Sequence, residues 1–213
     1  MEALRAEGIV LRKQPVTESS LVVTWFTREA GKLKTMAKGA RRLKGPWVGK
    51  IDLFYHDELL YLPSRRGDLH LLTDCFVVEA HRRLRESVAG VAAAAYACEL
   101  VEAITEVEDA QSVMFEELAG VLSAVEGGGA TAGLMIWFEM RLMTLAGWRP
   151  QWRKPSGLER ALQSLAGATR AGAQRVKLSE AQVREAREIV GRSWVEAVGR
   201  WPRSRAMWEQ FSR

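Results

Sequence analysis

The residues that suggest a chemistry most directly are the basic side chains between Gly31 and Lys50. Seven lysines and arginines lie in this stretch, with no aspartate or glutamate among them. A solvated surface usually mixes both signs, so a run of one sign favours a ligand that carries negative charge. Nucleic acid is such a ligand, because lysine and arginine neutralise its phosphates and release counterions. The seven residues are Lys32, Lys34, Lys38, Arg41, Arg42, Lys44 and Lys50.

The centre of this run lies between two turn signals, Gly39 on one side and Gly45-Pro46 on the other. Glycine lets a backbone turn sharply and approach a ligand closely, so residues 40–44 are predicted to form a loop that contacts a phosphate backbone. Trp47 follows the loop, and two roles are open for it: stacking on an unpaired base, or closing one end of a folded barrel. Three more basic residues extend the predicted DNA surface: Arg12, Lys13 and Arg28.

Other chemistries have little support. Cys75 and Cys98 lie far apart, so a C-x-x-C zinc pair is excluded and a disulfide framework is not expected. The histidines at 56, 70 and 81 lack neighbouring ligands, and we interpret them as structural. The glycine run at 127–129 has no lysine of the kind that a phosphate-binding loop needs. We therefore expect no metal site, no cofactor and no enzymatic activity.

The composition is that of a folded protein. The 213 residues are 47% hydrophobic and 27% charged, with a formal net charge of +5 that favours an acidic partner. Residues 1–85 hold 16 basic and 10 acidic side chains. Residues 86–140 hold no basic and 10 acidic side chains, and residues 141–213 hold 15 basic and 6 acidic ones. The acidic middle block is expected to repel DNA. We recognise no export signal and no bilayer-spanning stretch, so we expect a cytoplasmic protein.

The elements that position these residues change in type along the chain. Alternating apolar and polar residues and intervening turn signals predict five strands, at residues 6–16, 21–27, 32–37, 51–62 and 69–78. Five strands in about 80 residues favour a small closed barrel, which leaves no exposed edge. Helical spacing predicts helices at 87–106, 115–125 and 134–146, and Ser179 with Gln182 forms a capping-box pattern before another.

Several of these segments, taken in order, resemble the RecO family of bacterial recombination mediators. Residues 7–11 and 18–32 are similar to the family's first strands, and residues 36–42, MAKGARR, are the most specific match. Residues 95–100 and 141–150 resemble its first long helix and the helix end before its third module. The resemblance covers roughly residues 1–150. It implies an α+β fold, with an OB-fold five-stranded β-barrel at residues 1–80 that binds DNA and an α-helical domain at residues 81–213.

One part of the family pattern is missing. Family members often carry four cysteines of a zinc ribbon after a Gly-aromatic-x-Pro segment, whereas residues 151–213 hold neither cysteine nor histidine. No metal site is therefore carried over, and we expect residues 151–178 to be irregular in place of the ribbon.

The resemblance also implies a function in the RecF pathway of DNA repair. Such a protein binds single- and double-stranded DNA, promotes strand annealing and assists RecA loading with RecR, in the bacterial cytoplasm at the nucleoid. A further implied partner is the acidic carboxyl-terminal tail of single-stranded-DNA-binding protein. Basic residues that could receive this tail are Arg141, Arg149, Arg203 and Arg205. The alternative hypothesis is a protein-interaction adaptor whose barrel binds an acidic protein partner instead of DNA.

Overall fold

The computed structural model describes residues 2–148 and 156–212. Close backbone contacts divide the chain into two compact units. The barrel unit comprises Met1–His81 and Thr105–Ala119, and the helical unit comprises Arg82–Ile104 and Gly120–Arg213. The sequence predicted a single division after residue 80, which leaves residues 105–119 in the helical domain. Contacts of that segment with the barrel, described below, account for the different grouping.

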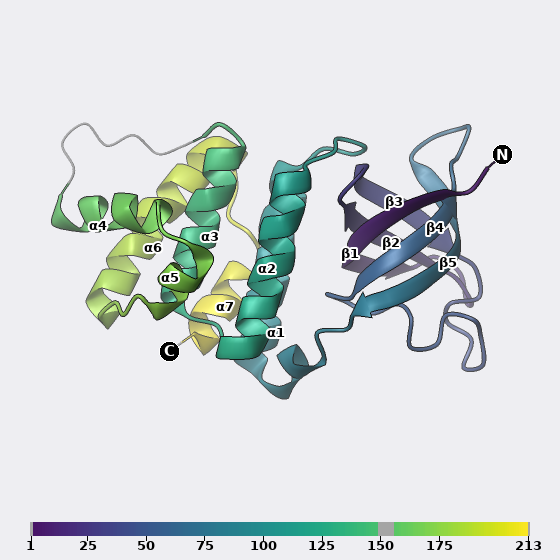
Figure 1. Cartoon of the computed structure of the whole chain (residues 1–213), viewed down its shortest axis with the longest axis horizontal. Coiled ribbons are helices and arrows are strands. Elements are labelled where there is room, and N and C mark those ends of the chain that lie inside the picture. The colour runs from purple at the N-terminus through teal and green to yellow at the C-terminus, as the bar shows by residue number, and fades with distance from the viewer. Residues whose placement is uncertain (1, 149–155, 213) are drawn as a thin grey trace. The chain divides into compact units, whose positions relative to one another are not determined.

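The barrel unit holds five strands that close on one another in the order β1-β2-β3-β5-β4 (Figure 1). Neighbouring strands are antiparallel except for β3 and β5, which pair in parallel from Lys34 with Leu69 to Met36 with Leu71. The predicted fold class, an OB-type barrel followed by helices, is confirmed. The strands are β1 (Leu4–Pro15), β2 (Leu21–Thr27), β3 (Gly31–Ala37), β4 (His56–Leu62) and β5 (Leu69–Glu79).

Alternation along the strands separates the barrel core from the basic surface. In β3, Leu33, Thr35 and Ala37 are buried, while Lys32, Lys34 and Met36, which alternate with them, are partly exposed. The Trp25 indole donates a 2.8 Å hydrogen bond to Thr35 Oγ1, which satisfies both polar groups inside the barrel. One face of β3 therefore lines the core, whereas residues 23–27 of β2 are all buried, so both faces of that strand are covered.

The fourth strand begins later than the sequence predicted. Residues 51–55 form a turn in which Tyr55 N donates to Asp52 O, and Phe54 has a φ of +69°. A left-handed backbone at a bulky residue breaks the regular strand geometry, so β4 starts at His56. The segment still bonds to β1, because Val10 N donates to Tyr55 O and Phe54 N donates to Val10 O.

Residues 105–119 pack on the barrel. Glu108 N donates to Lys32 O at 3.1 Å, and Lys32 Nζ donates to Thr105 O at 2.6 Å. Phe115 completes the contact, with its ring centroid 5.4 Å from that of His56 and 6.3 Å from that of Phe26. These contacts explain why this segment belongs to the barrel unit, although its residues 112–119 begin helix α2 (Ser112–Gly128), whose remainder belongs to the helical unit.

The helical unit is built around α3, whose residues from Gly133 to Met140 are all buried. α4, α5 and α6 pack against α3, and α1 packs against α7 (Figure 1). No helix within the described residues combines the length and hydrophobicity that crossing a bilayer requires. The helices are η1 (Arg82–Glu86), α1 (Val88–Ile104), α2 (Ser112–Gly128), α3 (Ala132–Leu145), α4 (Gly157–Ala166), α5 (Arg170–Arg175), α6 (Glu180–Val198) and α7 (Arg205–Phe211).

Helix caps explain why the predicted start of α6 is confirmed and why the predicted irregular segment contains two helices. The predicted capping box of Ser179 and Gln182 begins α6. Residues 151–178 were expected to be irregular, but α4 and α5 lie within this range. Ser156 and Glu159 form a capping box at the start of α4, and the Thr169 side chain caps α5. Each cap satisfies backbone N–H groups that a short helix otherwise leaves exposed, and α4 also buries Leu162 and Leu165 on one face.

Candidate nucleic-acid interface

Residues 38–50, which we call the basic loop, follow β3 directly. Gly39 has a φ of +75°, and Arg42 N donates to Gly39 O at 3.1 Å, so the chain leaves the strand through a tight turn. Lys38, Arg41, Arg42 and Lys44 are all exposed. Among the described residues, no carboxylate pairs with Lys38, Arg42 or Lys44, and their charges are therefore available to a ligand.

Hydrogen bonds hold the basic loop in place on two sides. Arg41 N donates to Ser19 O at 2.9 Å and Arg41 Nη1 donates to Thr17 O at 2.8 Å, which joins the loop to the turn between β1 and β2. On the other side, the Trp47 indole donates to Lys38 O at 2.8 Å. The barrel thus fixes the backbone of Lys38, at the start of the cation cluster, and Arg41 within it.

Trp47 was considered for base stacking, and the structure corrects this. Its side chain is 7% exposed and belongs to the barrel core with Trp25 and Leu33. A ring enclosed by core side chains offers no open face to a base. Trp47 instead closes the end of the barrel, the other role considered for it, because its size fills the space below the loop and its N–H finds a backbone acceptor.

Most other predicted cations are paired with carboxylates. The Lys34 and Asp68 side chains are 2.6 Å apart, Lys50 and Asp74 are 2.7 Å apart, and Lys13 pairs with Asp52. The hydrogen bonds from Lys34 and Lys50 lower the pKa of Asp68 and of Asp74. Each lysine–carboxylate pair therefore carries little net charge. To bind a phosphate, the lysine must give up its carboxylate partner.

Three predicted residues remain. Arg28 bonds to Glu7 at 2.7 Å and to Glu116, and its guanidinium carbon lies 4.9 Å from the centre of the Phe115 ring. The Lys32 ammonium bonds to the Thr105 carbonyl, so its role is to join segment 105–119 to β3. Arg12 lies exposed on β1, opposite Thr24 in the register.

Two exposed apolar side chains near these cations were not identified from the sequence. Leu43, between Arg42 and Lys44, is 95% exposed, and Phe76 on β5 is 49% exposed. The Lys50 ammonium lies 5.2 Å from the centre of the Phe76 ring. Phe76 stands in the apolar run Cys75 to Val78, which looks like core in sequence, so only the fold reveals its exposure.

In the helical unit, Arg205 is committed to structural contacts. Its Nε lies 2.7 Å from Glu209 Oε1, and its Nη2 donates to Arg187 O at 2.7 Å. The guanidinium also lies 3.9 Å from the centre of the Trp201 ring, and the side chain is only 12% exposed. It cannot receive a partner without losing these contacts, and we no longer count it among candidate partner residues.

The other predicted partner residues are scattered. Arg203 is exposed, and its backbone N–H donates to Glu99 at 2.8 Å. Arg141 lies half-buried on α3. Arg149 lies outside the described residues.

A buried carboxylate lies close to Arg205. Glu139 on α3 is buried, and its Oε1 accepts a 3.0 Å hydrogen bond from the Tyr96 hydroxyl. Burial raises the pKa of Glu139 to about 7, although the positive charge of Arg205 acts in the opposite direction. Glu139 is thus a structural acid that titrates near neutral pH.

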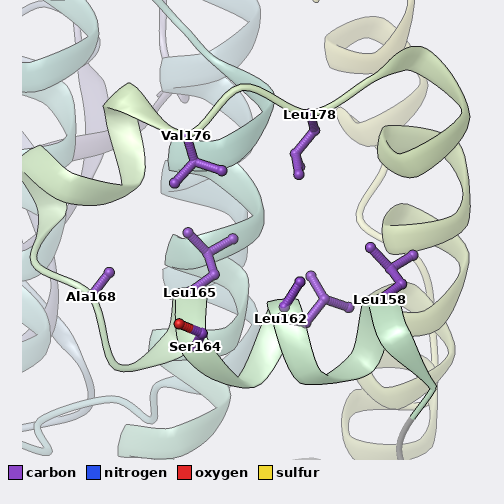
Figure 2. Close-up of a pocket in the computed structure, with 8 residues that line it drawn as sticks. Leu158, Leu162, Ser164, Leu165, Ala168, Val176 and Leu178 are labelled. Carbon is purple, nitrogen blue, oxygen red and sulfur yellow. The ribbon is translucent and has the colours of Figure 1, made fainter.

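Two hollows among the described residues of the helical unit bear on ligand binding. The first, with a volume of about 260 Å³, is lined by Leu158, Leu162 and Leu165 on one side and by Val176 and Leu178 on the other (Figure 2). The lining recorded for it among the described residues contains no charged side chain. The second, of about 570 Å³, is lined by apolar residues together with Arg184, Arg187, Glu180 and Glu209.

Comparison with known proteins agrees with this arrangement. The family model described as "Recombination protein O N terminal" matches residues 1–81, and "Recombination protein O C terminal" matches residues 85–159. The chain is 32% identical over 146 residues to "DNA repair protein RecO" of Syntrophus aciditrophicus, which covers 68% of this chain and 56% of the relative. It is 33% identical over 147 residues to the protein of that name from Roseiflexus sp., covering 69% and 51%. The chain thus matches little more than half the length of these curated relatives.

Proposed function

The chain belongs to the RecO family, and from this premise we propose that it acts in DNA repair by binding the DNA backbone through its basic loop. The observation that carries the proposal is the state of Lys38, Arg42 and Lys44, which are exposed and without a carboxylate partner among the described residues. Arg41 contributes from the base of the loop, where one guanidinium nitrogen is already bonded to Thr17. Cations held in this way suit phosphates, which every DNA sequence presents alike.

The proposed mechanism needs no covalent chemistry. The loop neutralises phosphates on one strand, which lowers the repulsion that keeps a second strand away. In this way the protein binds single- and double-stranded DNA and promotes annealing of complementary strands. We further propose that it assists RecA loading together with RecR, as the family resemblance implies, and that it does so as a non-enzymatic mediator.

For the acidic tail of single-stranded-DNA-binding protein, we propose the larger hollow of the helical unit as the seat. Arg184 and Arg187 supply positive charge there, beside the carboxylates of Glu180 and Glu209, while Val183 and Leu178 supply apolar surface. The predicted arginines at 203 and 205 do not appear in its lining. A tail with acidic and apolar residues needs both kinds of contact, and the smaller, uncharged hollow in Figure 2 offers only one.

The test is a DNA-binding titration over a range of salt concentrations. The loop variant replaces Lys38, Arg42 and Lys44 with alanine. The control, which we call the wall variant, makes the same replacement at Arg5, Lys13 and Lys34. It also removes three positive charges from the barrel, but these charges are paired with the carboxylates of Glu58, Asp52 and Asp68.

For the wild-type protein, the logarithm of the affinity for single-stranded DNA should fall linearly with the logarithm of the salt concentration. About four phosphate contacts predict a slope of about −3. The loop variant should reduce that slope by about 2, and the wall variant by less than about 1. Equal losses in the two variants would contradict the loop as the site. A wild-type protein that binds an acidic protein partner but no DNA would instead favour the adaptor hypothesis.

A further inference from the structure

Phe76 is an exposed aromatic residue on the part of β5 that extends beyond its pairing with β3. The registered β3 pairs end at Leu71, while β5 continues to Glu79. Phe76, Val77 and Val78 are exposed in this continuation. A phenyl ring that keeps 49% of its surface in solvent contributes little to the core, so its exposure calls for a ligand.

The charges around Phe76 favour a nucleic acid as that ligand. The Lys50 ammonium lies 5.2 Å from the ring centre and is held there by Asp74 at 2.7 Å. Glu58, the cross-strand neighbour of Phe76, pairs with Arg5. Both nearby acids are thus neutralised by cations, and the surface around the ring does not repel a phosphate chain.

A continuous set of contacts connects Phe76 to the basic loop. The Trp47 indole bonds to the Lys38 carbonyl at 2.8 Å, and Lys50 N donates to Trp47 O at 3.1 Å. Lys50 then reaches over Phe76, and its carbonyl oxygen lies 3.7 Å from the Cys75 sulfur. The start of the basic loop at Lys38 and the exposed ring are therefore supported by connected residues, Trp47 and Lys50.

We propose that Phe76 stacks on an unpaired base of DNA while the basic loop binds the neighbouring phosphates. The inference rests on the proposed function and assigns to Phe76 the stacking role that the sequence considered for Trp47. Every base has a π face, so stacking adds affinity without selecting a sequence. In a duplex the base faces are covered by their neighbours. The contribution of Phe76 is therefore confined to single strands.

The experiment compares wild type, Phe76→Leu and Phe76→Tyr in the full chain, with a thymidine oligonucleotide and a duplex of equal length at several salt concentrations. Phe76→Leu keeps an apolar side chain but removes the ring, and it is expected to weaken single-strand affinity about tenfold. Its salt slope should match wild type, because no charge is lost. Duplex affinity should change less than about twofold, and Phe76→Tyr should retain single-strand affinity.

Equal single-strand affinities of wild type and Phe76→Leu would overturn the inference and leave the proposed function intact. An equal loss for both DNA forms would also overturn it, since stacking on a flat ring cannot affect a closed duplex in that way. If wild type bound neither form, the proposed function itself would fail, and the loop variant would then show no change from wild type. The two failures are therefore distinguishable.

Discussion

Residues 38–44 and 200–205 carry similar basic sequences, four cations in seven residues and three in six, yet their surroundings differ. In the first segment, Lys38, Arg42 and Lys44 extend into solvent without a carboxylate partner among the described residues. In the second, Arg205 lies between Glu209 and the Trp201 ring. The same residue types therefore form a candidate ligand site in one unit and a structural network in the other. What distinguishes the two is whether a carboxylate reaches the cation, as Glu209 of the same helix reaches Arg205.

The largest effect is expected from removing the structural cation. Arg205→Ala leaves Glu209 unpaired and takes positive charge away from buried Glu139, so the free energy of unfolding should fall by about 4 kcal/mol. Urea denaturation measures this change. The exposed neighbour gives the control: Arg203→Ala should lower stability by less than about 0.5 kcal/mol. Similar stabilities for both variants would remove the contrast between the two basic segments.

A pH titration of stability sharpens the same comparison. The pKa of Glu139 is raised from 4.5 to about 7 in the folded protein, so the unfolded chain releases this proton first as the pH rises. The contribution of neutral Glu139 to the free energy of unfolding is therefore complete below pH 4.5. It is lost as the pH rises to about 7, and the loss amounts to about 3 kcal/mol. Glu139→Gln cannot titrate. Its unfolding free energy should therefore lack this decrease in denaturation experiments at pH 5 and pH 7.5, and an unchanged decrease would contradict the assignment.

A smaller effect is expected when the basic loop is given its own acid. Leu43 is 95% exposed between Arg42 and Lys44, so Leu43→Glu places a carboxylate beside both cations without disturbing the core. DNA affinity should fall about tenfold at low salt, with the thermal unfolding midpoint unchanged. Leu43→Gln removes the same apolar group without adding charge and serves as the control. If the glutamine and glutamate variants bind DNA equally, charge at the loop is not what matters.

Local patterns in the sequence predicted much of the fold. Alternation and turn residues located the strands, and Ser179 with Gln182 located the start of α6, because these features depend on residues close in sequence. The start of β4 was wrong because the positive φ of Phe54 is imposed by contacts with β1. The Ser156 and Glu159 capping box of α4 was present in the sequence but was not recognised.

The candidate site was predictable only in part. The basic loop was visible as a run of cations, but the pairing of Lys34 with Asp68 depends on strand register across 34 positions. The burial of Trp47 and the exposure of Phe76 depend on where the barrel closes and where the β3 pairing ends. Neither is a property of neighbouring residues, which is why the sequence left two roles open for Trp47 and did not single out Phe76.

The hydrogen bond between the Trp47 indole and the Lys38 carbonyl has a consequence for the kinetics of association. Together with the bonds from Arg41 to Thr17 and Ser19, it fixes residues 38–41. If the loop binds DNA as proposed, the conformational entropy of these residues is lost during folding and not at each encounter with DNA. Association is then limited by diffusion and electrostatic attraction and requires no ordering of the loop. A protein that meets many DNA sites in succession can therefore use the same loop geometry each time.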